Sequence, residues 1–264
     1  MGIPGDIRKK YPYLDNETIL MGYRGSIAHG MYLPKEDPHS IDDKDVMAVI
    51  VPPIEYYFGL REWGSKGTRE IFHNEWDIVS YELRKMLRLL AKGNPNVLSL
   101  LWLPDNLYIK RTEWGDMMID NRSLFATRSV YHSFSGYAHG QLHRMTHYKF
   151  EGYMGQKRKA LVDKYGYDCK NAAHLIRLLR MGIEFLNEGT LYVTRQDAQQ
   201  LLDIKKGEWT LEKVKEESDR LFRRAEEAYD HSKLPDKPDM EKVNRLSVDI
   251  LRRAHETIPP TLEK

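Results

Sequence analysis

The run Asp42-Asp43-Lys44-Asp45, at the start of an apolar segment, is the first candidate for chemistry in this sequence. Side chains two positions apart on a strand point to one face, so Asp43 and Asp45 aim together while Lys44 points away. Paired carboxylates repel each other unless a cation lies between them, and Mg²⁺ takes one or two carboxylates together with substrate phosphates. The alternative is a solvated acidic loop with Asp42 in a turn.

A third carboxylate, Asp77, follows in Glu75-Trp76-Asp77-Ile78-Val79-Ser80. A charge among apolar neighbours on a half-buried strand costs free energy unless it has a partner. A neighbouring strand that carries Asp43, Asp45 and a metal ion would supply that partner. An exposed position on an amphipathic strand is the alternative.

Gly25-Ser26 comes directly after a predicted strand over Thr18–Tyr23. Glycine allows a tight turn and a close approach of the backbone to a phosphate. Backbone N–H groups at the start of a following helix, with the Ser26 hydroxyl, would then bind phosphate oxygens. An ordinary Gly-Ser turn is the alternative.

The elements that position these residues follow from hydrophobic periodicity. Residues 45–51 and 76–80 are also predicted strands, and a helix follows over residues 81–91. The second half of the chain is predicted to be helical at residues 129–150, Gln156–Tyr165, residues 169–187, residues 210–231 and residues 240–256. We therefore expect an α+β protein with two lobes and a cleft between them.

Composition favours a folded protein without a membrane span. Of 264 residues, 41% are hydrophobic and 30% are charged, and the net charge of +2 neither requires nor excludes a nucleic-acid partner. The single cysteine, Cys169, excludes an internal disulfide and is typical of a reducing compartment. No apolar stretch reaches the ~20 residues of a membrane helix and no signal peptide is recognisable, so a cytoplasmic protein is expected.

The order strand, Gly25-Ser26, loop, Asp43-x-Asp45 on a strand and Asp77 on a later strand resembles the nucleotidyltransferase signature of the DNA polymerase β superfamily. With Tyr81-Glu82-Leu83-Arg84-Lys85 and Gly93-Asn94-Pro95-Asn96, the first half is similar to the RlaP-type family, which is associated with RNA repair. Three aspartates crowd residues 42–45, and the family's Asp-x-Asp before an apolar run favours Asp43 and Asp45.

The resemblance implies a nucleotidyltransferase domain over residues 1–125, with a mixed sheet like the polymerase β palm, and a helical domain over residues 126–264. It also implies that Asp43, Asp45 and Asp77 hold two Mg²⁺ ions, or Mn²⁺, and that the Gly-Ser turn grips the triphosphate. Asp77, the carboxylate nearest the acceptor in this family, is the candidate general base.

Lys170, His174 and Arg177 lie at i, i+4 and i+7 on the helix predicted over residues 169–187. Related two-lobe nucleotidyltransferases supply basic residues from a helical lobe to the β- and γ-phosphates. The resemblance therefore makes these three residues nucleotide-binding candidates, and a solvated face with salt bridges is the alternative. The basic run Gln156-Lys157-Arg158-Lys159 would either bind phosphate or form a solvated surface.

Two further groups of residues are ambiguous. His139, His143 and His147 recur every four residues, which fits either a zinc site or polar packing. The aromatic residues at 56–58 and Trp63 could stack on a base or pack against the core.

The expected function is Mg²⁺-dependent transfer of NMP from NTP to an acceptor hydroxyl, with the 3′ end of an RNA such as tRNA as the acceptor. The RNA rests on the family resemblance alone. Two alternatives are a toxin-like enzyme that AMPylates a protein hydroxyl and a non-catalytic nucleotide- or RNA-binding protein.

Overall fold

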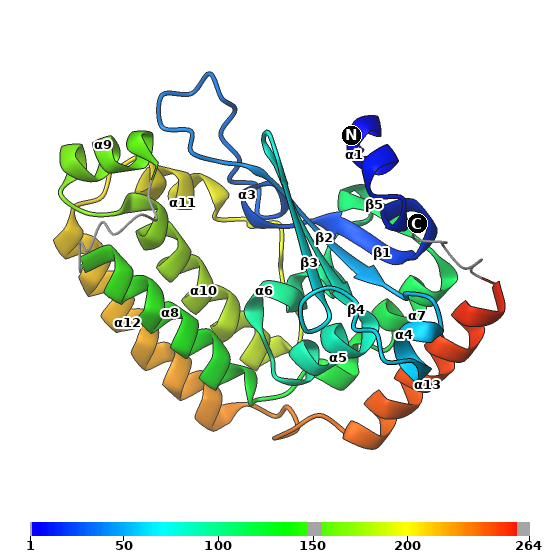
Figure 1. The fold of residues 1–264 in the computed structure, drawn as a ribbon. Helices are drawn as coiled ribbons and strands as arrows, with labels where there is room; N and C mark the ends of the chain where they lie inside the picture. The colour runs from blue at the N-terminus through cyan, green and yellow to red at the C-terminus, as the bar shows by residue number, and fades with distance from the viewer. Residues whose placement is uncertain (1, 147–154, 258–264) are drawn as a thin grey trace.

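A computed structural model describes residues 2–146 and 155–257 (Figure 1). Within this part of the chain, five strands form one mixed sheet in the order β3-β4-β2-β1-β5. β2 and β4 are parallel, and the other neighbouring pairs are antiparallel. The strand bounds are β1 Thr18–Tyr23, β2 Lys44–Ile50, β3 Thr68–His73, β4 Trp76–Glu82 and β5 Tyr108–Arg111.

Helices follow and separate the strands. Those of the first half are α1 Gly5–Lys10, α2 Tyr13–Asn16, α3 Gly25–Ala28, α4 Glu55–Phe58, α5 Leu83–Ala91, α6 Pro95–Leu98 and α7 Glu113–Asp120. Those of the second half are α8 Val130–Thr146, α9 Gln156–Tyr165, α10 Cys169–Glu188, α11 Ala198–Lys205, α12 Leu211–His231 and α13 Met240–Thr257. Short 3₁₀ turns are η1 Ser99–Trp102 and η2 Asp105–Leu107, which precede β5, and η3 Arg122–Phe125, which follows α7.

The central strand β2 is apolar on both faces, because the sheet is covered on both. Val46, Ala48 and Ile50 pack with α1, α2 and Trp63 on one face. Their neighbours Met47, Val49 and Val51 belong to a larger cluster on the other face, formed with α5, α7 and the helical half. This alternation decides where each polar side chain of β2 points.

The helical half is built around α10, which is buried along most of its length and packs between α8 and α12 (Figure 1). Asp168 caps the start of α10 by accepting from the backbone N–H of Asn171 at 3.2 Å. Gly189, in the left-handed conformation at φ 66°, ends the helix. Both ends of α10 are therefore capped by residues of its own flanking turns.

The predicted α+β fold is confirmed. The three predicted strands exist as β1, β2 and β4, and the predicted helices match α5, α8, α9, α10, α12 and α13 within a few residues at each end. Residues 147–150 of one predicted helix lie outside the described residues. The edge strands β3 and β5 were not predicted, since most of their side chains are only half-buried or exposed.

The division into residues 1–125 and 126–264 stays a prediction. α13 returns to the first half, where it packs on α5 and α7 (Figure 1), and the imidazole Nε2 of His255 lies 2.9 Å from the carbonyl oxygen of Pro52. In the described ranges, no helix is both long enough and apolar enough to cross a membrane.

Candidate active site

Parallel pairing of β2 with β4 places Asp45 directly opposite Asp77. Asp45 shares its face of β2 with Met47, and Asp77 shares its face of β4 with Val79, so both carboxylates point to the side of the sheet covered by the helical half. The two carboxylates line a cavity of about 330 Å³. The predicted pairing of carboxylates on neighbouring strands therefore occurs for Asp45 and Asp77.

Gly25 begins α3 and brings the backbone against one of these carboxylates. Its φ is 61°, a conformation that favours glycine. A Cβ at this position would lie only 2.1 Å from Oδ2 of Asp45. Both conformation and space therefore require glycine here. Ser26, the next residue, lines the same cavity.

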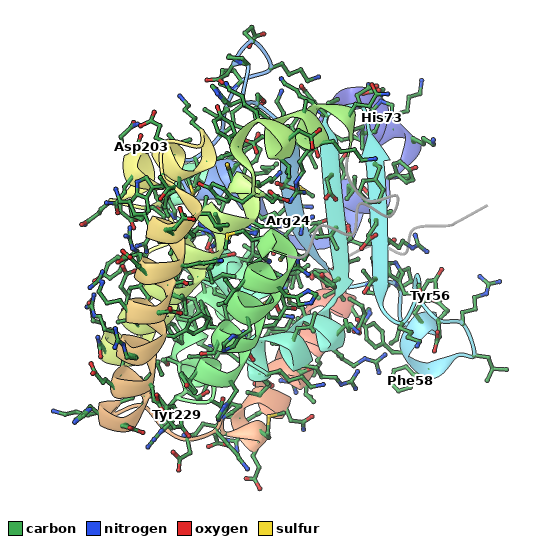
Figure 2. The ribbon with its side chains drawn as sticks, turned by 90° about the vertical axis from the view of Figure 1, so that its left-hand side faces the viewer. Arg24, Tyr56, Phe58, His73, Asp203 and Tyr229 are labelled. Atoms are coloured by element: carbon green, nitrogen blue, oxygen red, sulfur yellow. The ribbon has the colours of Figure 1, made fainter. Side chains whose placement is uncertain are left out.

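Arg24, which sequence reasoning treated only as part of a turn, lies between the two acids. One guanidinium nitrogen, Nη2, donates to Oδ2 of Asp77 at 2.9 Å and lies 3.8 Å from Oδ1 of Asp45. Figure 2 shows Arg24 between the helical bundle and the strands of the sheet. A cationic side chain directly before Gly-Ser was the available signal for this contact.

The carboxylate pair is short of positive charge even with Arg24 present. Burial, opposed by Arg24 and reinforced by the charge of Asp77, raises the pKa of Asp45 to about 6.

In the described ranges, no group of three or more His, Cys, Asp and Glu side chains is arranged to hold a metal ion. Mg²⁺ needs only one or two carboxylates when phosphates and water complete its shell, so Asp45 and Asp77 fit such an ion.

The opposite wall of the cavity comes from α10, and it includes the predicted residues Lys170, His174 and Arg177. Nζ of Lys170 donates to the carbonyl oxygen of Ile41 at 3.2 Å. Of the residues that the structure describes, no carboxylate lies within 4 Å of the Arg177 guanidinium, whose Nη1 contacts Sδ of Met181 at 3.1 Å. Burial, with the nearby Arg195 cation, lowers the pKa of Arg177 to about 9.

Two imidazoles beside Arg177 are held neutral. Burial and the Arg177 charge keep the pKa of both His29 and His174 well below the ordinary histidine value. His29 also lines the cavity, with Nδ1 2.9 Å from the carbonyl oxygen of Val193. Sequence reasoning missed His29, although it lies one helical turn after Ser26.

The three neighbouring aspartates have different surroundings. Asp42 is buried, binds Nζ of Lys205 and accepts the backbone N–H of Leu33 at 3.0 Å. Asp43 is exposed, and the described cavity-lining residues include Asp42 and Asp45 but not Asp43. The charge of Asp43 nevertheless contributes to the raised pKa of Asp45, so Asp43 lies near the rim.

The ambiguous groups can now be placed. His139 stacks on Phe222 with ring centroids 4.2 Å apart, which is polar packing, and His147 lies outside the described residues. Trp63 is buried in the core, whereas Phe58 is exposed. Arg158 of the basic run pairs with Asp168 at 2.8 Å.

Comparison with known proteins identifies the family of this chain. The family model of RlaP, the RNA repair pathway DNA polymerase beta family, matches residues 7–249. The chain belongs to the RlaP family. Family and fold together indicate a nucleotidyltransferase of the polymerase β type, as the sequence predicted.

Two individual proteins are also similar. The uncharacterized protein YcgL of Bacillus subtilis (strain 168) is 39% identical over 70 residues, which cover 26% of this chain and 26% of YcgL. The crystal structure of a nucleotidyltransferase-like protein from Exiguobacterium sibiricum 255-15 aligns over 94% of this chain and 78% of its own, at 12% identity and a TM-score of 0.28. The assignment to the RlaP family rests on the family match over residues 7–249.

Proposed function

We propose that this RlaP family member transfers NMP from a Mg²⁺-bound NTP to an acceptor hydroxyl, and that the acceptor is the 3′ end of an RNA such as tRNA. The observation that carries the proposal is the opposition of charges across one cavity. Asp45 and Asp77 form its acidic wall, and its basic wall holds the Arg177 cation, which has no carboxylate within 4 Å among the described residues. A metal–triphosphate binds to both walls, because its metal cation is coordinated by carboxylates and its phosphates accept hydrogen bonds from buried donors.

The reaction exchanges a phosphoanhydride bond of the NTP for a phosphodiester bond to the acceptor. The acceptor hydroxyl oxygen attacks the α-phosphorus, the bond from this phosphorus to the oxygen bridging to the β-phosphate breaks, and pyrophosphate leaves. Two Mg²⁺ ions, when bound, would stabilise the attacking and leaving oxygens. Asp43, Asp45 and Asp77 are the proposed ligands, with Mn²⁺ as a substitute.

The residues of the chain itself have separate roles in this proposal. Asp77 accepts the proton of the attacking hydroxyl, and Arg24 holds Asp77 in place before the substrate enters. The Gly25-Ser26 turn lets phosphate approach the backbone closely. Lys170 and Arg177 neutralise the leaving pyrophosphate, and the neutral His174 donates a hydrogen bond to it.

Label transfer tests the proposal. The protein is incubated with each [α-³²P]NTP or [γ-³²P]NTP, Mg²⁺ and total RNA, and RNA and protein are separated before counting. We expect α-label, but no γ-label, on RNA with the wild type and none with Asp43→Asn/Asp45→Asn. Label on protein instead would replace the RNA acceptor by a protein hydroxyl. A folded wild-type protein that moves no label to either, with Mg²⁺ or Mn²⁺ present, contradicts the proposed activity.

A further inference from the structure

A second cavity, of about 410 Å³, lies at the other end of the same parallel strand pair. Glu82 ends β4 five residues beyond Asp77, so the two cavities are separated by about 17 Å of strand. Its walls come from α4, the turn before β3 and the outer face of α5. We name it the basic groove, after its residues Lys66, Lys85, Arg88 and Lys92.

Six cationic side chains line this cavity against two carboxylates, those of Glu62 and Glu82, so the basic groove carries an excess of positive charge. The Glu82 carboxylate caps α5 by accepting the backbone N–H groups of Arg84 at 2.9 Å and Lys85 at 3.1 Å, and Nε of Arg84 at 3.2 Å. Of the residues described, no carboxylate lies within 4 Å of the side-chain nitrogens that define the groove. Arg88 and Lys92 are exposed. An anionic ligand would therefore meet free cations.

The cations on α5 form a line that points toward the candidate active site. Lys85, Arg88 and Lys92 are spaced i, i+3 and i+7, which places them along one helix face over about 10 Å. Directly after Lys92, the turn enters α6, whose Pro95 and Asn96 line the cavity of Asp45 and Asp77. A flexible polyanion lying along α5 would thus reach the carboxylates.

Lys66 occupies a backbone conformation that a lysine rarely adopts. Its φ is 51° in the turn between Ser65 and Thr68, where glycine or asparagine is favoured. The turn is tight against α5, since a Cβ on Gly67 would lie 3.1 Å from Cβ of Lys85. The fold therefore keeps a lysine in an unfavourable turn position, beside the other groove cations.

Aromatic side chains accompany these charges. Tyr56 and Tyr57 of α4 line the groove, and Phe58 on the same helix is 86% exposed. Figure 2 shows Tyr56 and Phe58 on a projecting segment, on the side of the molecule opposite Asp203 and Tyr229. Cations for phosphates next to aromatic rings for bases are the features by which proteins bind single strands, whose bases are free to stack.

We propose that the basic groove and α4 bind single-stranded RNA, with its phosphates on Lys66, Lys85, Arg88 and Lys92 and a base on Phe58. The delivery of its 3′ end along α5 to Asp45 and Asp77 rests on the proposed function. The binding itself does not, so the two can fail separately.

Binding is measured by fluorescence anisotropy of a labelled single-stranded RNA, without NTP, over a range of salt concentrations. Lys85→Gln/Arg88→Gln/Lys92→Gln removes three cations. Lys215→Gln/Arg223→Gln/Arg224→Gln on α12 makes the same charge change on exposed helix positions distant from the groove. We expect the groove variant to bind at least tenfold more weakly at 0.1 M salt, and its log–log salt slope to flatten by about 2. The α12 variant should stay within about twofold of the wild type.

Two single changes separate binding from folding. Lys66→Asn suits the turn, so it should keep or raise Tm while weakening RNA binding. Phe58→Ser removes a ring that the fold leaves exposed and should cost about fivefold or more in affinity. Equal losses in the groove and α12 variants, or unchanged binding in both single variants, would overturn the inference. Tighter binding of duplex RNA or of an acidic protein would also overturn it.

Discussion

The two ends of the β2–β4 strand pair differ in the sign and the burial of their charged side chains. At the Asp45–Asp77 end, acids and bases face each other across a cavity, and most of these side chains are largely buried. At the Glu82 end, the basic groove carries mainly one sign of charge, on exposed side chains. Water screens the second set but screens the first much less, so a single change should matter far more at the first end.

The largest effect is expected for Asp45→Asn. It should lower kcat/KM roughly 10³-fold or more, because the cation loses a ligand at the reacting phosphate, while RNA binding at the basic groove stays unchanged. Label-transfer kinetics and RNA anisotropy on the same preparation check both parts. A parallel loss of RNA binding would erase the distinction between the two ends.

The same variant should be more stable than the wild type in Mg²⁺-free buffer. A pKa raised from 3.8 to about 6 means that ionised Asp45 destabilises the fold at neutral pH, by up to about 3 kcal/mol. Well below pH 3.8 the carboxyl is protonated in folded and unfolded chains alike, so the two Tm values should converge there. A lower Tm for Asp45→Asn at pH 7 would contradict the burial argument.

Arg177→Met should raise the KM for NTP about 30-fold or more, since a buried donor to phosphate is lost. Stability should not fall, because this guanidinium has no carboxylate within 4 Å among the described residues. The matched control on α10 is Arg180→Met. Arg180 pairs with Asp197 at 2.7 Å and with Glu217 at 3.0 Å, so its loss should lower Tm and leave the KM nearly unchanged. The reverse pattern would make Arg177 a structural residue.

Gly25→Ala should cost roughly tenfold or more in kcat/KM and about 1–3 kcal/mol in stability, because the methyl group collides with Asp45. Gly30→Ala is the control, since Gly30 has a similar φ of 71° but a Cβ there meets nothing closer than 3.6 Å. We expect Gly30→Ala to lower the stability and to leave kcat/KM unchanged. Steady-state kinetics and thermal unfolding of both variants separate the collision from the backbone strain.

The last contrast concerns salt rather than a substitution. Raising salt from 50 to 200 mM should weaken RNA binding roughly 50-fold, because four phosphate contacts give a log–log salt slope of about −2.8. The KM for Mg²⁺–NTP should change less, because its partners are buried. Equal salt dependence of both ligands would show that the two ends do not differ in screening.

Local patterns made much of this structure predictable. The near-continuous apolar run of residues 45–51 predicted the buried strand that the structure shows as β2. The spacing of Lys170, His174 and Arg177 indicated one face of α10, and all three line the cavity. The catalytic and nucleotide-binding roles of these residues stay predictions.

Contacts between distant parts of the chain could not be predicted. The cationic partners of Asp42 are Lys205 and Lys170, both far away in the sequence, so nothing near Asp42 marks it as an anchor for the helical half. Arg24 meets Asp77 only because β1 and β4 flank β2 in the sheet. The edge strand β3 has one fully buried side chain, Ile71, and therefore lacks the periodic signal of a half-buried strand.

The central claim is that both walls of the cavity hold one metal–triphosphate. Its most direct test is calorimetric titration of an unreactive NTP analogue with Mg²⁺ into the wild type, Asp45→Asn, Arg177→Met and the double variant. Each single variant should bind at least tenfold more weakly. The two losses should not add in the double variant, because both residues act on one ligand. Analogue binding that is equal in all four proteins, or independent of Mg²⁺, would contradict the claim.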